Sequence, residues 1–467
     1  MRTILHIDLE TYSSVNIKKS GLYKYVQSPD FEILLFAYAY DDDPVIVIDL
    51  KEKEMIPPQV ITGLNDPQVI KMAHNAAFEY FCLSRFYITD LKQWRCTMVH
   101  ALYCGFPASL EAVGEAMNFG QDKKKMGIGK ALIKYFCIPC AATKANGGRT
   151  RNCPHHNPEK WKLFKQYCAQ DVVTEREIYR VLEEYPVPDM EWYYWQLDQI
   201  INIGGAAVDM ELVEGALALS EESRDELSGR AKELTGLDNP NSVAQLKDWI
   251  ERNSGLELEN LNKATVAEIL SGASEETTVT EMLKIRRELG KTSVKKYTAI
   301  KECVCDDGRV RGLLQFYGAN RTGRFAGRLV QIQNLPKNYM GTLDTAREFV
   351  KHKRIDAVRM IYGNVPDTLS QLIRTAFIPG EGCHFAVADF SAIEARVIAW
   401  LAGEQWRLDV FRTHGKIYEA SASAMFGVPL ESIAKGQPNY KLRAKGKVAE
   451  LALGYGGGVR TYQYGSP

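Results

Sequence analysis

Residues 384–404 constrain the fold of this chain more than any other stretch. Their first part, 384–388, is mostly apolar and predicts a short buried strand. Ser391 and Glu394 follow with the Ser-x-x-Glu spacing of a capping box, so a helix is expected to begin there. Four apolar residues at helical spacing would give that helix one apolar face: Ile393, Val397, Ile398 and Leu401.

Asp389 lies where the predicted strand passes into the predicted helix. A carboxylate at that place is held by rigid backbone and can bind a hard cation such as Mg²⁺. Positioning such a cation against a phosphate is the main task in phosphoryl and nucleotidyl transfer. The same residues would also fit an exposed turn aspartate followed by an ordinary helix cap. This stretch alone therefore leaves both interpretations open.

The sequence Asp-Phe-Ser-Ala-Ile-Glu-Ala-Arg-Val at 389–397 resembles the first palm motif of family A DNA polymerases, the DNA polymerase I type. That family has Asp-Tyr-Ser-Gln-Ile-Glu-Leu-Arg at this point. The resemblance implies that Asp389 binds a catalytic metal ion. It also implies that Glu394 is a steric gate that excludes a 2′-hydroxyl and so selects deoxynucleotides.

Three acidic pieces occur in the first 185 residues. Period two places Asp8 and Glu10 on one face of a predicted strand, and Glu79 follows a short apolar segment. Tyr167 and Asp171 are one turn apart on a predicted helix. Each piece alone fits a solvated strand end or an ordinary helix face. Together, in this order, they resemble the three motifs of the DnaQ-like 3′–5′ proofreading exonucleases that precede many family A polymerases.

This second resemblance implies that Asp8, Glu10 and Asp171 hold two metal ions, about 4 Å apart. Tyr167 would orient the attacking water. Glu79 departs from the common pattern, which has Asp, although the longer acid can still reach a metal ion or its water. The expected cofactor is Mg²⁺ or Mn²⁺, with two ions in each active site.

Cysteines in the same region offer another interpretation. Cys137 and Cys140 have Cys-x-x-Cys spacing, and Cys153 is followed by two histidines, which would suit zinc. The irregular remainder of the set makes zinc the less favoured interpretation. The basic, glycine-rich residues around it are expected to touch a DNA backbone instead: Lys144, Arg149 and Arg151.

The middle of the chain, 186–310, is expected to be helical after a boundary at two prolines. A helix is predicted over 208–234, Ser242 should cap the next, and Thr265 with Glu268 should form a capping box. Seven basic residues follow: Lys284, Arg286, Arg287, Lys291, Lys295, Lys296 and Lys301. They fit a solvated helix face, or, by resemblance, a polymerase thumb that contacts DNA phosphates.

Residues 322–328 and 331–336 resemble the family's Thr-Gly-Arg and Asn-Leu-Gln-Asn-Ile-Pro motif. Arg324 would then contact the minor groove of the primer-template near the growing end, where correct base pairs present similar acceptors. Gln333 and Asn334 would also bind DNA.

Arg443 and Lys447 are one helical turn apart and would present two cations on one face, which suits a nucleoside triphosphate. A basic amphipathic helix that ends in glycines is the alternative. The pattern Arg-x3-Lys-x7-Tyr-Gly resembles the family's fingers motif, which implies that Tyr455 stacks at the nascent base pair. Leu451 stands where the family commonly has an aromatic residue, so sugar selection at the 3′ position is expected to differ.

The length, the charge balance and the lack of long apolar stretches restrict how these motifs can act. The chain has 467 residues, with 58 basic and 58 acidic side chains, so DNA binding must rely on local basic patches. No stretch approaches the roughly 18 apolar residues of a membrane span. Without a signal-peptide pattern, we expect a protein of the cytoplasm of a bacterial or phage-infected cell, with its ten cysteines reduced.

The predicted fold class is α/β plus α+β. An RNase H-like exonuclease domain (1–185) would precede a helical thumb-like region (186–310) and a partial palm with fingers (311–467). The family's His-Asp-Glu motif, which carries the second palm carboxylate, does not occur. We therefore expect a truncated product, an artificial fragment or half of a split polymerase completed by a separate C-terminal fragment.

The leading hypothesis is a DNA-directed DNA polymerase with a proofreading exonuclease, which acts on primer-template DNA and dNTPs by a two-metal mechanism. An autonomous 3′–5′ exonuclease whose polymerase remnant only holds DNA is the second hypothesis. A non-catalytic DNA-binding accessory protein is the third.

Overall fold

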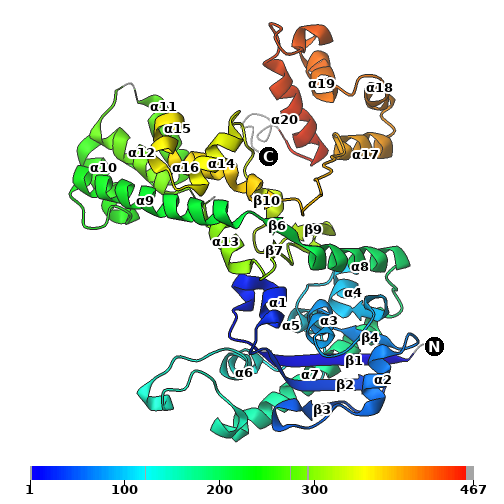
Figure 1. The fold of residues 1–467 in the computed structure, drawn as a ribbon. Helices are drawn as coiled ribbons and strands as arrows, with labels where there is room; N and C mark the ends of the chain where they lie inside the picture. Colours follow the sequence, from blue (N-terminus) through cyan, green and yellow to red (C-terminus); the bar gives the residue numbers. More distant parts are fainter. Residues whose placement is uncertain (1–2, 121, 274, 292–293, 459–467) are drawn as a thin grey trace. The chain divides into compact units, whose positions relative to one another are not determined.

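The computed structural model describes residues 3–120, 122–273, 275–291 and 294–458. The chain forms two compact units, Met1–Gly382 and Cys383–Pro467 (Figure 1). The acidic pieces near the N-terminus lie in the first unit, and the stretch around Asp389 lies in the second. The two sequence regions with the strongest predicted chemistry therefore belong to separate units.

A five-stranded mixed sheet begins the first unit, with the strand order β3-β2-β1-β4-β5. β2 is antiparallel to β1 and β3, whereas β4 is parallel to β1 and β5 is parallel to β4. Both faces of β1 and β2 are covered, which explains their nearly continuous apolar sequence. The strands are β1 (Ile4–Tyr12), β2 (Glu32–Tyr40), β3 (Ile46–Asp49), β4 (Ile70–Ala73) and β5 (Trp94–Cys96).

Helix α7 (Pro158–Leu182) packs across β1 and β2. It begins where the Asn157 side chain accepts a hydrogen bond from the backbone N–H of Lys160. Aromatic side chains of α7, among them Phe164, fill the space between helix and sheet. The other helices of this part are α1 (Ile17–Gln27), α2 (Pro58–Asn65), α3 (Ala77–Ser84), α4 (Thr97–Tyr103), α5 (Leu110–Ala116) and α6 (Gly129–Phe136).

Helices dominate the next part of the chain, as the sequence predicts. They are α8 (Asp189–Gly204), α9 (Met210–Thr235), α10 (Val243–Ser254), α11 (Lys263–Gly272), α12 (Thr278–Leu289) and α13 (Lys295–Cys303). α9 confirms the helix predicted over 208–234, and Ser242 caps α10 as predicted. No helix among the described residues is long and apolar enough to cross a membrane.

The predicted capping box of Thr265 and Glu268 is wrong. Asn262 caps α11 instead, because its side-chain oxygen accepts hydrogen bonds from the backbone N–H groups of Ala264 and Thr265, at 2.9 and 3.0 Å. The helix therefore starts before Thr265, which lies inside its first turn.

The rest of the first unit combines short strands and helices. β6 (Ala206–Val208), β7 (Arg309–Val310) and β10 (Phe377–Ile378) form a sheet in the order β10-β6-β7. β8 (Leu314–Ala319) and β9 (Arg324–Gly327) form an antiparallel pair. Three helices complete it and share one hydrophobic cluster with α9: α14 (Leu343–Lys351), α15 (Ile355–Tyr362) and α16 (Val365–Leu372).

Asn202 of α8 links this helix to the β8–β9 pair. Its amide donates to the carbonyl of Leu314 and accepts from the N–H of the same residue, both at 2.9 Å. The side chain thus satisfies backbone groups that a neighbouring strand would otherwise pair. Phe316, two residues along β8, packs into the core beside the five-stranded sheet. The β8–β9 pair is therefore anchored to the N-terminal part of the chain.

The described residues of the second unit, 383–458, form four α-helices: α17 (Ile393–Ala402), α18 (Gln405–Thr413), α19 (Ile417–Phe426) and α20 (Leu442–Gly454). The strand predicted over 384–388 is wrong, because these residues form an exposed loop. A strand requires a neighbour for its backbone hydrogen bonds, and none of the described strands pairs with this segment.

One further prediction for this stretch is wrong. Ala392, in the left-handed conformation with φ 51°, precedes α17 and makes no side-chain cap, so Ser391 and Glu394 form no capping box. The apolar side chains predicted to share one face of α17 are 40–71% exposed: Ile393, Val397, Ile398 and Leu401.

Asp198 lies on α8, the helix that carries Asn202, and its burial can be tested through the pH dependence of stability. It is 2% exposed, and burial raises the pKa of its carboxyl from 3.8 to about 6. Between these values the folded protein binds the proton more tightly than the unfolded chain, so the free energy of unfolding falls as the pH rises toward 6. We expect Asp198→Asn to increase the stability at pH 8 by about 1–3 kcal/mol, and by less at pH 5.

Urea unfolding at both pH values measures this difference. Asp189→Asn, which changes an exposed aspartate of the same helix, is the matched control and should show no comparable dependence on pH. An equal gain at pH 5 and pH 8 for Asp198→Asn would contradict the raised pKa.

Candidate active sites

Three predicted acids meet in the first unit. β1 carries Asp8 and Glu10, and α7 carries Asp171 across the same strand. One side-chain oxygen from each of the three lies within 4.8 Å of the others. Glu10 and Asp171 are buried, and Asp8 is partly buried. The strand periodicity and the helical spacing read from the sequence therefore bring these carboxylates into one acid cluster.

Burial raises the pKa of all three carboxyls above their ordinary values. The pKa of Asp8 is raised further by Asp171, and that of Glu10 by Asp8 and Asp171, because like charges lie close together. Lys125 opposes these increases. A cation is thus what the acid cluster needs in order to stay ionised.

Lys125 was not predicted as a site residue. Its Nζ forms an ion pair with Asp171 and lies 4.7 Å from the centre of the Tyr167 ring. Burial alone would lower the pKa of Lys125, but Asp171, Asp8 and Glu10 raise it overall. The only signal in the sequence is the run of three lysines at 123–125, which has no helical or strand period.

Tyr167 lies beside Asp171, and burial together with the neighbouring carboxylates raises its pKa. Its ring packs against the start of α6, where a Cβ on Gly129 would lie 2.2 Å from a ring carbon. Any larger residue at position 129 would therefore displace Tyr167.

Two thiols lie behind the acid cluster. Cys168 Sγ is 3.6 Å from an Asp8 oxygen, and Cys137 Sγ is 3.7 Å from a Glu10 oxygen. Cys140 instead contacts the carbonyl of Arg149. Among the residues that the structure describes, the only set of three or more His, Cys, Asp or Glu side chains suited to a metal ion is Asp8, Glu10 and Asp171.

The basic residues expected on DNA make contacts within the protein. Arg149 donates to Asn152 and to the carbonyl of Asn146. Arg151 pairs with Glu32 at 2.5 Å and lies 3.6 Å from the centre of the Tyr12 ring. Both guanidinium groups thus brace the loop over β1 and β2.

Glu79, on α3, is buried near Asp8, and burial and that neighbour raise its pKa. Its Oε2 and the Oδ1 of Asp171 have no hydrogen-bond partner in the described part of the chain. Buried carboxylate oxygens without partners, grouped around a negative centre, match the oxygen ligands that Mg²⁺ and Mn²⁺ prefer. The residues present therefore fit a divalent metal ion.

In the second unit, Glu394, Leu451 and Tyr455 line one cavity of about 200 Å³. The Tyr455 hydroxyl donates to the Glu394 carboxylate. Phe390 also lines the cavity, whereas Asp389, the preceding residue, lies in the exposed loop and is not one of the lining residues. Three residues predicted to bind the dNTP are thus brought together.

The two predicted triphosphate-binding cations lie one turn apart on α20, as the sequence predicts. Arg443 forms an ion pair of 2.7 Å with Glu419 and lies 5.3 Å from the centre of the Tyr418 ring. Lys447 is exposed. Glu419 of α19 therefore holds Arg443 in place, whereas Lys447 is accessible to a ligand.

Comparison with known proteins identifies the family. Residues 211–463 match DNA polymerase family A. A DNA polymerase of Bacillus phage SP02 is 55% identical over 456 residues, which cover 97% of this chain and 69% of the phage protein. The chain belongs to DNA polymerase family A.

More distant relatives agree with this polymerase assignment. The thermostable DNA polymerase I of Thermus aquaticus is 43% identical over 72 residues, 15% of this chain and 9% of that protein. A solved structure of the polymerase domain of Pol1 from M. smegmatis, in complex with DNA primer-template and dNTP, has a TM-score of 0.57 at 17% identity. The likeness covers 97% of this chain and 68% of that chain. The family predicted from the palm motif is thus confirmed, and the protein is a DNA polymerase, a nucleotidyltransferase of DNA replication that uses divalent metals.

The polymerase's predicted DNA contacts lie in the first unit. Arg324 is on β9, and Gln333 and Asn334 form part of the 3₁₀ helix η5 (Ile332–Asn334). Gly327, at the end of β9, approaches η5 so closely that a Cβ there would lie 2.1 Å from Gln333 Oε1. The β8–β9 pair and η5 therefore pack against one another.

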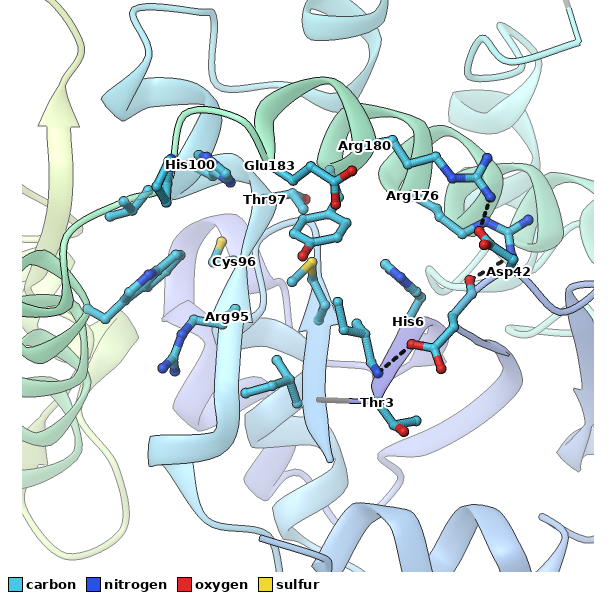
Figure 2. Close-up of a pocket in the computed structure, with 18 residues that line it drawn as sticks. Thr3, His6, Asp42, Arg95, Cys96, Thr97, His100, Arg176, Arg180 and Glu183 are labelled. Carbon is cyan, nitrogen blue, oxygen red and sulfur yellow. Dashed lines mark hydrogen bonds and ion pairs between the residues drawn. The ribbon is translucent and has the colours of Figure 1, made fainter. Parts of the chain in front are cut away.

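A larger cavity of the polymerase, about 790 Å³, lies at the start of β1 (Figure 2). His6, Arg176 and Arg180 are among the residues that line it. None of the predicted site residues lines this cavity. His6 is held by a buried contact of 2.7 Å from its Nδ1 to Glu175, and Arg180 pairs with Asp42. Both His6 and Arg180 thus have acidic partners within the protein, and the size of the cavity alone does not mark a reaction site.

Glu450 connects three helices of the second unit. Its buried carboxylate contacts Arg407 of α18 and Ser421 of α19. We expect Glu450→Ala to destabilise this unit by about 3 kcal/mol, because Arg407 would lose its buried partner. The loss in the free energy of unfolding is measured by urea unfolding of the second unit, with limited proteolysis as the readout. Glu404→Ala, which removes the exposed partner of the same arginine, should cost about 1 kcal/mol or less. Equal effects of the two changes would contradict this assignment.

Proposed function

We propose that this DNA polymerase also carries a 3′–5′ proofreading exonuclease in residues 1–185. The observation that carries the proposal is the acid cluster, in which Asp8, Glu10 and Asp171 bring ligand oxygens within 4.8 Å of one another. Neither the mixed sheet nor α7 requires buried acids for its own stability, since burying them raises their pKa values at a cost. Such a costly arrangement is typical of a reaction site.

Two divalent ions, Mg²⁺ or Mn²⁺, would supply the electrophilic chemistry of phosphodiester hydrolysis when bound. Asp8, Glu10 and Asp171 would hold them. Glu79 has a buried oxygen without a partner and would accept a hydrogen bond from a bound water. Tyr167, fixed against Gly129, would orient the attacking water near Asp171.

For nucleotide addition we propose a thumb-like region at 186–310 and a palm with fingers at 311–467. Asp389 would bind the catalytic metals. Arg324, Gln333 and Asn334 would contact the primer-template, and the dNTP would bind against five residues: Glu394, Arg443, Lys447, Leu451 and Tyr455. The solved M. smegmatis polymerase domain with primer-template and dNTP supports these ligands. A separate C-terminal fragment stays a prediction.

The alternatives make different predictions about the intact protein. An autonomous exonuclease would shorten a primer and never extend it, whereas an accessory protein would do neither. The match to family A over residues 211–463 favours a polymerase over both.

The exonuclease proposal predicts that Asp8→Ala and Asp171→Ala abolish degradation of a mismatched primer, by at least about a hundredfold, because the metal ions lose ligands. The measurement follows a 5′-labelled mismatched primer-template with Mg²⁺ and without dNTPs. DNA binding, measured by fluorescence anisotropy, should stay within about twofold. Asp42→Ala, an exposed acid of the same domain, is the control. Normal degradation by either cluster variant would refute the site.

The fingers proposal predicts that Lys447→Ala weakens dNTP binding by about tenfold, equivalent to 1.4 kcal/mol, through loss of one charge-assisted contact. Binding is measured in a ternary complex with a dideoxy-terminated primer. Lys445→Ala, an exposed lysine of the same helix, should have little effect. Unchanged affinity in Lys447→Ala would remove this residue from the dNTP site, and the exonuclease should be unaffected in both variants.

A further inference from the structure

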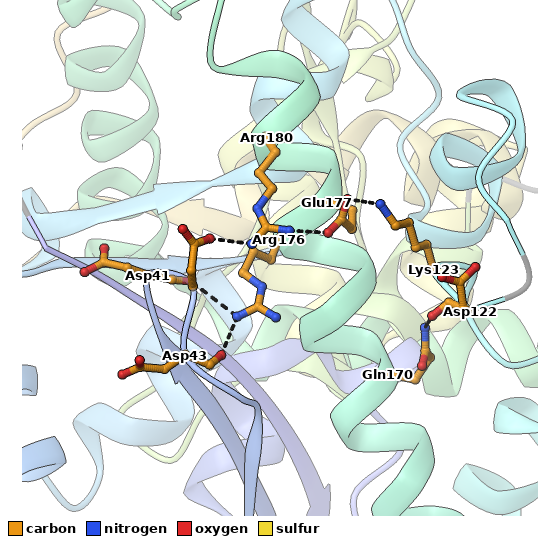
Figure 3. Close-up of polar contacts among 9 residues, drawn as sticks. Asp41, Asp43, Asp122, Lys123, Gln170, Arg176, Glu177 and Arg180 are labelled. Carbon is orange, nitrogen blue, oxygen red and sulfur yellow. Dashed lines mark hydrogen bonds and ion pairs between the residues drawn. The ribbon is translucent and has the colours of Figure 1, made fainter.

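The segment 122–125, between α5 and α6, is fastened to α7 beside the acid cluster (Figure 3). Gln170 donates to the backbone carbonyl of Asp122 at 2.8 Å. Lys123 forms an ion pair of 2.8 Å with Glu177, which also pairs with Arg180. Gln170 precedes Asp171, and Glu177 lies further along the same helix, so the segment is held at two points on α7.

Between them, these two contacts hold the segment so that Lys125 reaches the acid cluster. Lys125 Nζ pairs with the Oδ2 of Asp171, whose side chain is 5% exposed. The lysine side chain is 25% exposed, and its Nζ lies over the Tyr167 ring at 4.7 Å from the centre. Lys125 is therefore a partly buried cation, held against an acid that would bind metal and a tyrosine that would orient the attacking water.

Charge balance shows why this contact matters. Asp8, Glu10 and Asp171 place three carboxylates within 4.8 Å, and Lys125 is the cation that pairs with one of them. Two divalent ions would bring four positive charges to the same oxygens. The carboxylates would then be neutralised, and the ammonium group of Lys125 would no longer be attracted to them. Lys125 pairs with the Oδ2 of Asp171, whose Oδ1 has no hydrogen-bond partner in the described part of the chain. A metal ion bound to this carboxylate would lie close to the ammonium group and repel it. Metal binding and the Lys125 contact therefore weaken each other at Asp171.

We propose that Lys125 is the resident counter-cation of the acid cluster: it holds the carboxylates together in the metal-free protein and competes with divalent ions for Asp171. It is thus a positioning residue that sets the metal affinity of this site through the strap of residues 122–125. The inference rests on the proposed exonuclease function, because it concerns the metal ions of the same cluster.

The test measures metal binding directly. Mn²⁺ binding is followed by electron paramagnetic resonance in an Asp389→Ala background, so that the signal reports the acid cluster. We expect Lys125→Met, which keeps the length and removes the charge, to tighten Mn²⁺ binding by about tenfold, because the metal no longer displaces a lysine. Without metal, the same variant should melt at a lower temperature, and Mn²⁺ should raise its melting temperature more than it raises that of the parent.

Controls separate this role from an ordinary ion pair. Lys125→Arg keeps a competing charge and should keep the parent's affinity to within about threefold. Lys124→Met removes the adjacent lysine and should change nothing. Lys123→Met releases the strap from Glu177 while it keeps Lys125, so it should tighten Mn²⁺ binding by an intermediate factor. This last variant decides the question if Lys125→Met does not fold.

Unchanged or weaker Mn²⁺ binding in both Lys125→Met and Lys123→Met would overturn the proposal. The outcome is independent of the exonuclease assay. If Asp171→Ala still degrades a mismatched primer, the proposed function fails, whereas the Mn²⁺ comparison still decides whether Lys125 competes for the cluster. If degradation is lost in Asp171→Ala and Mn²⁺ affinity does not respond to Lys125, only the inference about Lys125 fails.

Discussion

Mutual repulsion among three carboxylates, two of them buried and one partly buried, is the constraint around which the N-terminal part of this polymerase is built. Asp8 and Glu10 are held by a central strand with neighbours on both sides, and Asp171 is held by a long helix that packs across it. Neither element can move without disturbing an aromatic core layer. Packing therefore supplies the free energy that keeps the like charges together, and Lys125 reduces how much of it is needed.

Much of this cluster could be predicted because it follows from local rules. Alternation along a strand places Asp8 and Glu10 on one face, and a helical turn relates Tyr167 to Asp171. The contacts of Lys125, Cys137 and Cys168 with the acid cluster were not predicted, since they depend on which segments pack together. Nothing in the sequence around Lys125 specifies that its loop crosses α7, and the thiols approach carboxylates more than a hundred residues away.

The errors have two physical origins. Residues 384–388 have the composition of a buried strand, but a strand forms only beside another, and no described strand lies there. At α11, Asn262 and Thr265 are both good caps, and local hydrogen-bond geometry selects the first. Arg149 and Arg151 were expected on DNA from charge alone; both make contacts within the protein, and a contact with DNA stays a prediction. Charge and composition identify candidates, whereas tertiary contacts decide their role.

The two candidate sites treat a phosphate in opposite ways. On α20, Lys447 is exposed and Arg443, paired with Glu419, lies one turn away, so positive charge on this helix would attract an anionic triphosphate before any chemistry occurs. The acid cluster is negative and repels a phosphodiester until cations neutralise it. One lysine balances only part of that charge, and divalent ions are needed for the rest. With no net charge on the whole chain to attract DNA, the local sign of each site decides where a phosphate can approach. The proposed proofreading site therefore depends on its metal ions for access to the primer end as well as for hydrolysis.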